Sequence, residues 1–186
     1  MNWQGWHFLP ETRRLRYGSH QVVKPDAWIN VEGELRMCEW GLHASKRPID
    51  ALTYAPGPIV CRVELRGDLQ HEDDKSVGRE RRVVWMAGAT ETLRDFARRC
   101  ALDVAHLWDA PEVVLQYLET GDESIRAAAR DAARAAARDA AGDAARAAAG
   151  AAAWAAGGAA ARDAAWAAAR EKQNRHLAQM LGRLKP

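Results

Sequence analysis

The sequence predicts an α+β protein: a small, mostly antiparallel sheet with one helix, followed by an all-helical, alanine-rich hairpin domain. The composition changes near residue 88, where short apolar runs separated by turn residues give way to helical periodicity. Residues 124–171 consist almost wholly of Ala, Arg, Asp, Gly and Trp. We therefore expect an α+β domain at 1–88 and a helical domain at 89–186.

The first domain contains several short candidate strands, at 3–8, 21–23, 27–31, 35–38 and 83–86. Residues 59–65 give the clearest pattern, because Cys61, Val63 and Leu65 alternate with polar residues. This alternation predicts a half-buried strand. Residues 68–78 are polar and predict an exposed loop.

The stretch from Gly41 to Ser45 predicts a turn and a short strand that lead into a helix at 48–55. Glycine supplies the backbone freedom of a tight turn. A serine such as Ser45 can accept hydrogen bonds from the free amides of a helix start, and Pro48 suits the first turn.

The second domain begins with two predicted helices. Thr90 is expected to cap the first, which runs to Leu107, and Gly121 ends the second, which starts near Pro111. In the alanine-rich tract the non-alanine residues recur every four positions. Each step of four overshoots one helical turn by about 40°, so the charged stripe winds round the helix. Glycines at 157–158 predict the turn between two antiparallel helices.

Composition narrows the function classes. The net charge of +2 gives no strong electrostatic case for nucleic acid or membrane binding. The three cysteines are odd in number and form no CxxC pair, which favours reduced thiols over a disulfide framework. Neither a signal peptide nor a membrane span is recognised. We therefore expect a cytoplasmic protein.

Two parts of the chain resemble known families. Residues 17–86 resemble a domain of unknown function common in phages and prophages, on the Gly41-Leu42-His43-Ala44-Ser45 motif with Cys38 before it and Tyr54 and Lys75 after it. On the run from Leu93 through Phe96 and Cys100 to Leu107, followed by the Ala-Arg-Asp-Trp repeats, residues 90–180 are similar to an immunity-protein family of bacteria and their mobile elements. Together they imply an accessory protein of phage or mobile-element conflict, and they bring no established activity.

An enzymatic alternative rests on an order of motifs similar to that of ADP-ribosyltransferase-like folds. In this hypothesis His20 holds a ribose hydroxyl and His43 or Tyr54 stacks on nicotinamide. Glu80 stabilises the oxocarbenium-like transition state. The candidate residues are His20, His43, Ser45, Tyr54 and Glu80. The first motif departs from the expected order, since Gly18 precedes Ser19-His20.

A metal site made of Cys38 and His43 with Cys61 or His20 is chemically conceivable, because thiolate and imidazole suit zinc. Its spacing matches no standard pair, so we expect neither a metal nor another cofactor.

The expected function is non-enzymatic binding that inhibits or neutralises a protein partner. Eight tryptophans are many for this chain, and tryptophan and arginine dominate interface hot spots. We expect Trp28 and Trp85 in the core. The candidate partner-binding residues are Trp3, Trp6, Trp154, Trp166, Arg134 and Arg138. Nucleic-acid binding is a further alternative, and the alanine-rich helices could support a homo-oligomer.

Overall fold

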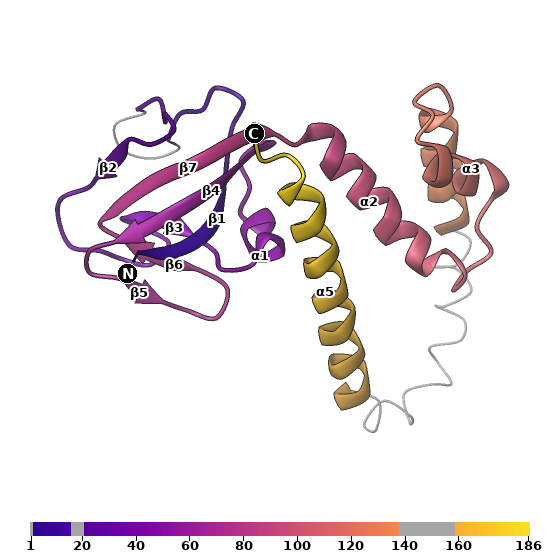
Figure 1. The fold of residues 1–186 in the computed structure, drawn as a ribbon. Coiled ribbons are helices and arrows are strands. Elements are labelled where there is room, and N and C mark those ends of the chain that lie inside the picture. Colours follow the sequence, from indigo (N-terminus) through magenta and orange to yellow (C-terminus); the bar gives the residue numbers. More distant parts are fainter. Residues whose placement is uncertain (1, 16–20, 138–158) are drawn as a thin grey trace. The chain divides into compact units, whose positions relative to one another are not determined.

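The computed structural model describes residues 2–15, 21–137 and 159–186, with side chains from residue 166 onwards in the last range. The chain divides into two compact units. The first contains residues 1–93 together with 172–186, and the second contains residues 94–171 (Figure 1). Antiparallel sheets and helices confirm the predicted α+β class.

A four-stranded sheet forms the main layer of the first unit. Its order is β1 (Trp3–Leu9), β4 (Ile59–Arg66), β7 (Glu80–Gly88) and β2 (Trp28–Asn30), and every neighbouring pair is antiparallel (Figure 1). The strand predicted at 59–65 is confirmed as β4. Its alternating pattern places one set of side chains on each face of the sheet.

A second antiparallel sheet has the order β3 (Leu42–Ala44), β6 (Ser76–Gly78) and β5 (Gln70–His71). The prediction of an exposed loop at 68–78 was therefore wrong for β6, whose three residues are all buried. Pairing with β3 and β5 draws this short strand into the protein, and the polar residues of the segment lie mainly in the turn before it.

The two sheets are joined at β1. Trp6 donates its backbone N–H to the Ser45 carbonyl at 2.7 Å, and Ser45 donates its own N–H to the Trp6 carbonyl at 2.9 Å. The core cluster contains residues of both sheets. We call the face of β1, β4 and β7 that carries these residues the inner face. The buried members of the cluster are Leu9, Val23, Ile29, Leu42, Ala44, Cys61, Val63, Leu65 and Val83.

Helix α1 spans Pro48–Thr53 and begins at the proline, as the sequence predicts. The predicted cap was wrong, because the N-cap residue is Arg47. Ser45 is only 3% exposed, and its backbone is held in the bridge to Trp6.

Two of the predicted strands are reduced to single bridges, Arg14–Val22 and Arg36–Trp40. The strand predicted at 35–38 was wrong for a local reason. Cys38 has a φ of 66°, in the left-handed region, which an extended strand does not contain. The chain therefore turns back within residues 36–40.

The helices are α2 (Thr90–Ala105), α3 (Glu112–Thr120), a helical stretch at 126–137 and α5 (Ala159–Gly182). Thr90 is the first helical residue of α2 and not its cap. Gly121 ends α3 with a φ of 69°, as predicted. The predicted glycine turn at 157–158, Trp154 and Arg138 lie outside the described residues.

The last turns of α5 belong to the first unit. Leu177 and Leu181, one turn apart, are both fully buried. The Asn174 side-chain oxygen accepts a hydrogen bond from the Ile49 amide of α1 at 3.4 Å. Trp166, further back in the helix, is 66% exposed.

We predict that Leu177→Ala lowers the free energy of unfolding by about 2–5 kcal/mol, because it leaves a cavity in the packing of α5. Trp166→Ala is the control and should change it by less than about 0.5 kcal/mol, since this side chain is largely in solvent. Urea unfolding followed by circular dichroism measures both. A cost below about 1 kcal/mol for Leu177→Ala contradicts the packing.

Candidate functional site

A cluster of polar side chains surrounds Lys75, in the turn that leads from β5 into β6. The Lys75 ammonium lies 3.1 Å from a Glu72 carboxylate oxygen, 3.7 Å from Asp74 and 3.5 Å from the Tyr54 hydroxyl. It also interacts with the thiol of Cys38. The cluster therefore ties together the 36–40 turn, the end of α1 and the β5–β6 turn.

Hydrogen bonds fix the protonation of this cluster. The Tyr54 hydroxyl donates to Asp74 at 2.5 Å, which raises the pKa of Tyr54 above its usual value. Contacts with Glu72 and then with Cys38 raise the pKa of Lys75. Both groups keep their protons near neutral pH, so neither is suited to act as a general base.

His43 faces the same cluster, and its ring is part of the local structure. The Cys38 amide donates to His43 Nε2 at 3.0 Å. Burial lowers the pKa of His43 below its usual value, a backbone interaction with Gly41 opposes this, and the charges of Arg81 and Lys75 lower it further. The accepting nitrogen of the neutral ring is thus already occupied.

The remaining catalytic candidates do not join this cluster. The Ser45 backbone is held by Trp6. Glu80 accepts two hydrogen bonds from Arg66, at 2.6 and 2.9 Å. The next residue along β7, Arg81, donates to the His43 carbonyl at 2.7 Å, so Glu80 points to the opposite face of the strand. His20 lies outside the described residues.

The cysteines of the hypothetical metal site also differ in their surroundings. Cys61 is fully buried in the core cluster, and burial raises its pKa to about 12, whereas Cys38 is exposed. Within the ranges that the structure describes, no group of three or more His, Cys, Asp and Glu side chains is placed to bind a metal ion.

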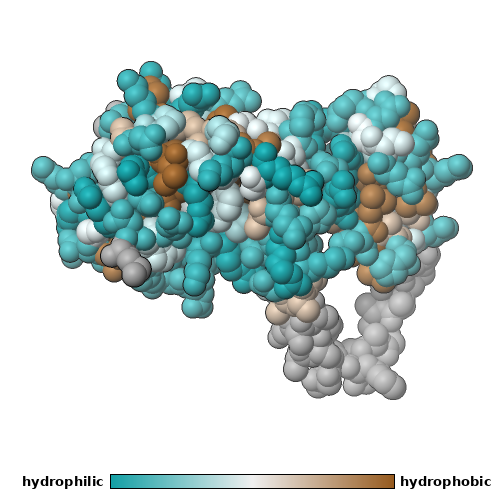
Figure 2. Space-filling view, in the orientation of Figure 1, coloured by the Kyte–Doolittle hydropathy of each residue, from teal (hydrophilic) through white to brown (hydrophobic). Residues whose placement is uncertain are grey.

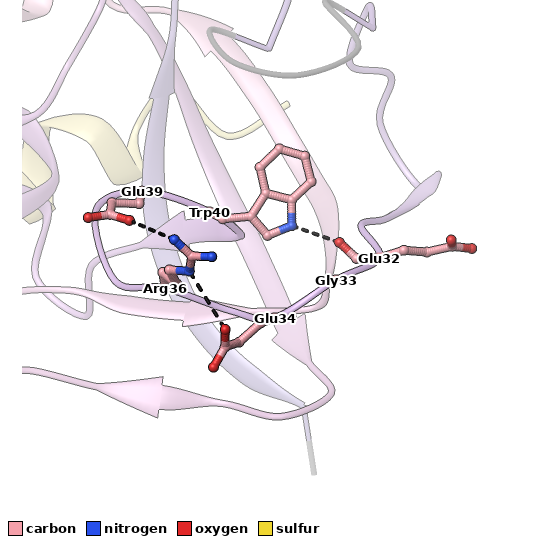
Figure 3. Close-up of a pocket in the computed structure, with 6 residues that line it drawn as sticks. All are labelled: Glu32, Gly33, Glu34, Arg36, Glu39 and Trp40. Carbon is pink, nitrogen blue, oxygen red and sulfur yellow. Dashed lines mark hydrogen bonds and ion pairs between the residues drawn. The ribbon is translucent and has the colours of Figure 1, made fainter.

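The segment from residue 32 to residue 40 surrounds an open hollow of about 470 Å³ (Figure 3). The Trp40 indole lies on one side, where its N–H donates to the Glu32 carbonyl at 2.7 Å. Arg36 lies between Glu34 and Glu39, at 3.7 and 3.5 Å. The hollow therefore presents an aromatic ring, and its arginine is already paired with carboxylates.

Tryptophan and arginine gather on the outer face of the main sheet, opposite the core. The strand register aligns Trp6, Arg62 and Trp85 across β1, β4 and β7. The two indoles meet edge to face at 5.8 Å, and the Arg62 guanidinium lies 5.1 Å from the centre of the Trp6 ring. These distances are typical of favourable aromatic and cation–π contacts.

A second row crosses the same face. Arg82 donates to Glu64 at 2.7 Å. The guanidiniums of Arg66 and Arg82 lie 3.8 and 5.3 Å from the Trp28 ring centre. We name the whole surface the tryptophan–arginine face. Its residues are Trp6, Trp28, Arg62, Arg66, Arg82 and Trp85, with Gln4, Glu64 and Glu80 between them.

The tryptophan predictions have a mixed outcome. Trp6 lies on this face. The core placement of Trp28 and Trp85 was wrong, because both are only partly buried, in outward register positions. Trp3 instead packs against the core cluster. The sequence reasoning missed the arginines, although the outward positions of the β4 alternation already pointed to Arg62.

Two further partner-binding candidates belong to the second unit. Trp166 is exposed, with Arg170 5.5 Å from its ring centre, and Arg134 lies in the helical stretch at 126–137. In the portion of the chain that the structure covers, no helix has the length and apolar character needed to cross a membrane.

We predict that Gly41→Ala lowers the free energy of unfolding by about 2 kcal/mol or more. Gly41 has a φ of 131°, and an added Cβ would collide with Val77 and come within 3.0 Å of Leu35. Gly88→Ala is the matched control, since its Cβ meets nothing within 4 Å. Thermal and urea unfolding measure the stability of both variants. An equal loss of stability in Gly41→Ala and Gly88→Ala would contradict the steric role given to Gly41.

We predict that iodoacetamide at pH 8 modifies Cys38 quickly and leaves Cys61 unmodified in the folded protein. A thiol of pKa about 12 is a thiolate in only about one molecule in ten thousand at this pH, and Cys61 is also buried. Peptide mass spectrometry measures the two rates. Denatured protein, in which both should react, is the control. Equal rates in the folded state contradict this placement.

Comparison with known proteins adds a domain match and no activity. The resemblance expected over residues 17–86 is supported as far as a domain of unknown function. No curated protein and no solved structure matches the chain. Residues 19–95, which run from before β2 into α2, match the family model described as a domain of unknown function, DUF7666.

Proposed function

We propose that this protein is a non-enzymatic binding module that inhibits or neutralises a protein partner by stoichiometric binding through the tryptophan–arginine face. The observation that supports this most is the set of three indoles and three guanidiniums in register on one sheet face. Tryptophan and arginine are the residues most enriched at interface hot spots. We propose phage or mobile-element conflict as the setting of this masking function, which is what the sequence resemblance implies.

The side chains of this face are held before any partner arrives. Trp28 contacts two guanidiniums, and Trp6 contacts Trp85 and Arg62. Gln4 accepts a hydrogen bond from Arg62 at 3.0 Å. Binding to ordered side chains costs less conformational entropy, which favours affinity.

The charges of the face favour a protein over nucleic acid. Arg82 is paired with Glu64 and Arg66 with Glu80. Three arginines against two glutamates leave a net charge of about +1 on the face. A phosphate backbone requires a larger excess of positive charge.

The indoles of the face alternate with polar and charged side chains, which are Gln4, Arg62, Glu64, Arg66, Glu80 and Arg82. On the side of the molecule that Figure 2 shows, hydrophilic residues cover most of the surface, and hydrophobic residues gather in several areas. Indoles and guanidiniums combine flat contact area with polar groups, so a surface of this kind can stay in water until its partner binds.

The ADP-ribosyltransferase-like alternative receives less support. Glu80 and the His43 carbonyl contact lie on opposite faces of β7. The Tyr54 hydroxyl and His43 Nε2 are engaged in local hydrogen bonds. A convergent cleft is what that chemistry requires.

We predict that Trp6→Ala and Arg62→Ala each weaken partner binding by about 30-fold or more, the size of a hot-spot loss of about 2 kcal/mol. Trp40→Ala is the matched control, because it removes an indole that is 41% exposed and is not among the residues of the face. Affinity capture with quantitative mass spectrometry identifies the partner, and calorimetric titration of the purified partner measures affinity and stoichiometry.

A stoichiometry near one and loss of binding only in the face variants support the proposal. Unchanged affinity of both Trp6→Ala and Arg62→Ala contradicts the proposal. Captured material that disappears on nuclease treatment, with binding that falls steeply as salt rises, indicates the nucleic-acid alternative instead.

A further inference from the structure

Arg62 differs from the two other arginines of the tryptophan–arginine face in its partners. Arg66 and Arg82 each form an ion pair with a glutamate. Among the described residues, the hydrogen bond found for the Arg62 side chain goes from Nη2 to the side-chain oxygen of Gln4, at 3.0 Å, and no carboxylate pairs with it. Since the Gln4 amide is neutral, the positive charge of Arg62 is left without a counter-charge on the face.

The next outward carboxylate along β4 is already engaged. Glu64 lies two positions from Arg62 on the same face. It accepts hydrogen bonds from Arg82 at 2.7 Å and from the side-chain amides of Asn2 and Gln4 at 3.1 and 3.4 Å. The bonds from Arg82 and then from Asn2 hold the pKa of Glu64 below its usual value. Glu64 therefore compensates the charge of Arg82 and leaves Arg62 unpaired.

The remaining donors of Arg62 are open to solvent. The side chain is partly buried, and burial lowers the pKa of Arg62, but a guanidinium keeps its proton at neutral pH. Four arginine nitrogens are buried without a hydrogen-bond partner in the described part of the chain, and none of them belongs to Arg62. A ligand that arrives from solvent can therefore reach the nitrogens that do not bond to Gln4.

A β-bulge places an indole beside this guanidinium. The β4–β7 register pairs Arg62 with Trp85, and the next residue of β4 with Val83. Val84 is therefore an extra residue on β7. Since Val83 belongs to the core cluster, regular alternation would turn Trp85 inward as well. The extra residue turns Trp85 outward, level with Arg62, and bulges often redirect a side chain in this way at functional sites.

We propose that Arg62, which the register places between Trp6 and Trp85, binds a carboxylate of the protein partner, so that the segment of the partner on this face is acidic. This inference rests on the proposed function and names the chemistry of its partner. Guanidinium and carboxylate groups form paired, charge-assisted hydrogen bonds. The indoles supply apolar surface for the residues beside the carboxylate, and they shield the ion pair from the screening that weakens exposed pairs.

The charge of the face favours a single carboxylate over a polyanion. The excess charge is about +1 and lies at Arg62, because the other two arginines are paired. A nucleic-acid backbone would bring further negative charges against Glu64 and Glu80. One aspartate or glutamate with apolar neighbours matches both the charge and the aromatic surroundings.

The test is a double-mutant cycle with peptide probes. Short random peptides are selected by ribosome display on the full wild-type chain, and we expect the selected peptides to carry an aspartate or glutamate next to an apolar residue. Replacing this acid by its amide, or introducing Arg62→Gln in the protein, should each weaken binding by about tenfold or more in calorimetric titration. The two changes together should cost little more than either alone, because they remove the same contact.

Arg66→Gln is the matched control, since it removes an equal charge from the same face at a guanidinium that is already paired with Glu80. The loss from Arg66→Gln and the loss from replacing the peptide acid should be additive. Additive losses for Arg62→Gln, or equal coupling for both arginines, overturn the inference. Selected peptides without acidic residues, or no selected peptide at all, do so as well.

Arg62→Lys provides a second readout if Arg62→Gln does not fold. It keeps the positive charge, and carbodiimide joins a lysine amine to a carboxylate in contact with it. Mass spectrometry should find the new amide bond between position 62 and the acidic residue of the peptide. Coupling at other positions alone contradicts the inference.

Trp6→Ala separates this inference from the proposed function. If Trp6→Ala abolishes capture of the partner while Arg62→Gln leaves its affinity unchanged, the face binds a partner and the carboxylate inference is wrong. If Trp6→Ala leaves the affinity for the partner unchanged while the peptide cycle shows coupling at Arg62, the carboxylate site stands and the proposed function is wrong.

Discussion

The exchange of two backbone hydrogen bonds between Trp6 and Ser45 organises the first unit of this protein. Because of it, β1 is bonded along one edge to β4 and at one point along the other edge to the segment that continues β3. Leu42 and Ala44 of β3 are thereby directed into the same core as the inward side chains of β4. Helix α1 follows within a few residues, so its position depends on the same junction.

The junction also separates two chemically different surfaces of one sheet. Strand alternation sends Arg81 inward and Arg82 outward. The outer arginines stack on indoles and pair with glutamates, which keeps them solvated and ordered. Among the described residues, the hydrogen-bond partner found for the inner arginine is the His43 carbonyl, and its charge lowers the pKa values of His7 and His43. The same residue type is therefore paired and solvated on one side of the strand and buried on the other.

The sequence was sufficient where a local rule decides the structure. The alternation of Cys61, Val63 and Leu65, the helix start at Pro48 and the helix end at Gly121 were all confirmed. The sequence was insufficient where contacts between distant segments decide the local structure. Ser45 has the right chemistry for a cap, but its backbone is taken by Trp6. The polar composition of 68–78 concealed a strand that is buried by its neighbours, and periodicity alone could not tell which face of the sheet holds Trp28 and Trp85.

The matched domain begins at residue 19, yet β1 (Trp3–Leu9) lies before it and pairs with β4 over its whole length. A chain shortened to the matched segment would leave the N–H and C=O groups of that edge of β4 unpaired. Free strand edges recruit strands from other molecules, which leads to domain swapping or aggregation. The seven residues of β1, which lie outside the matched segment, thus pair with the edge of β4 and protect it. A fragment that lacks them would be prone to assemble with copies of itself.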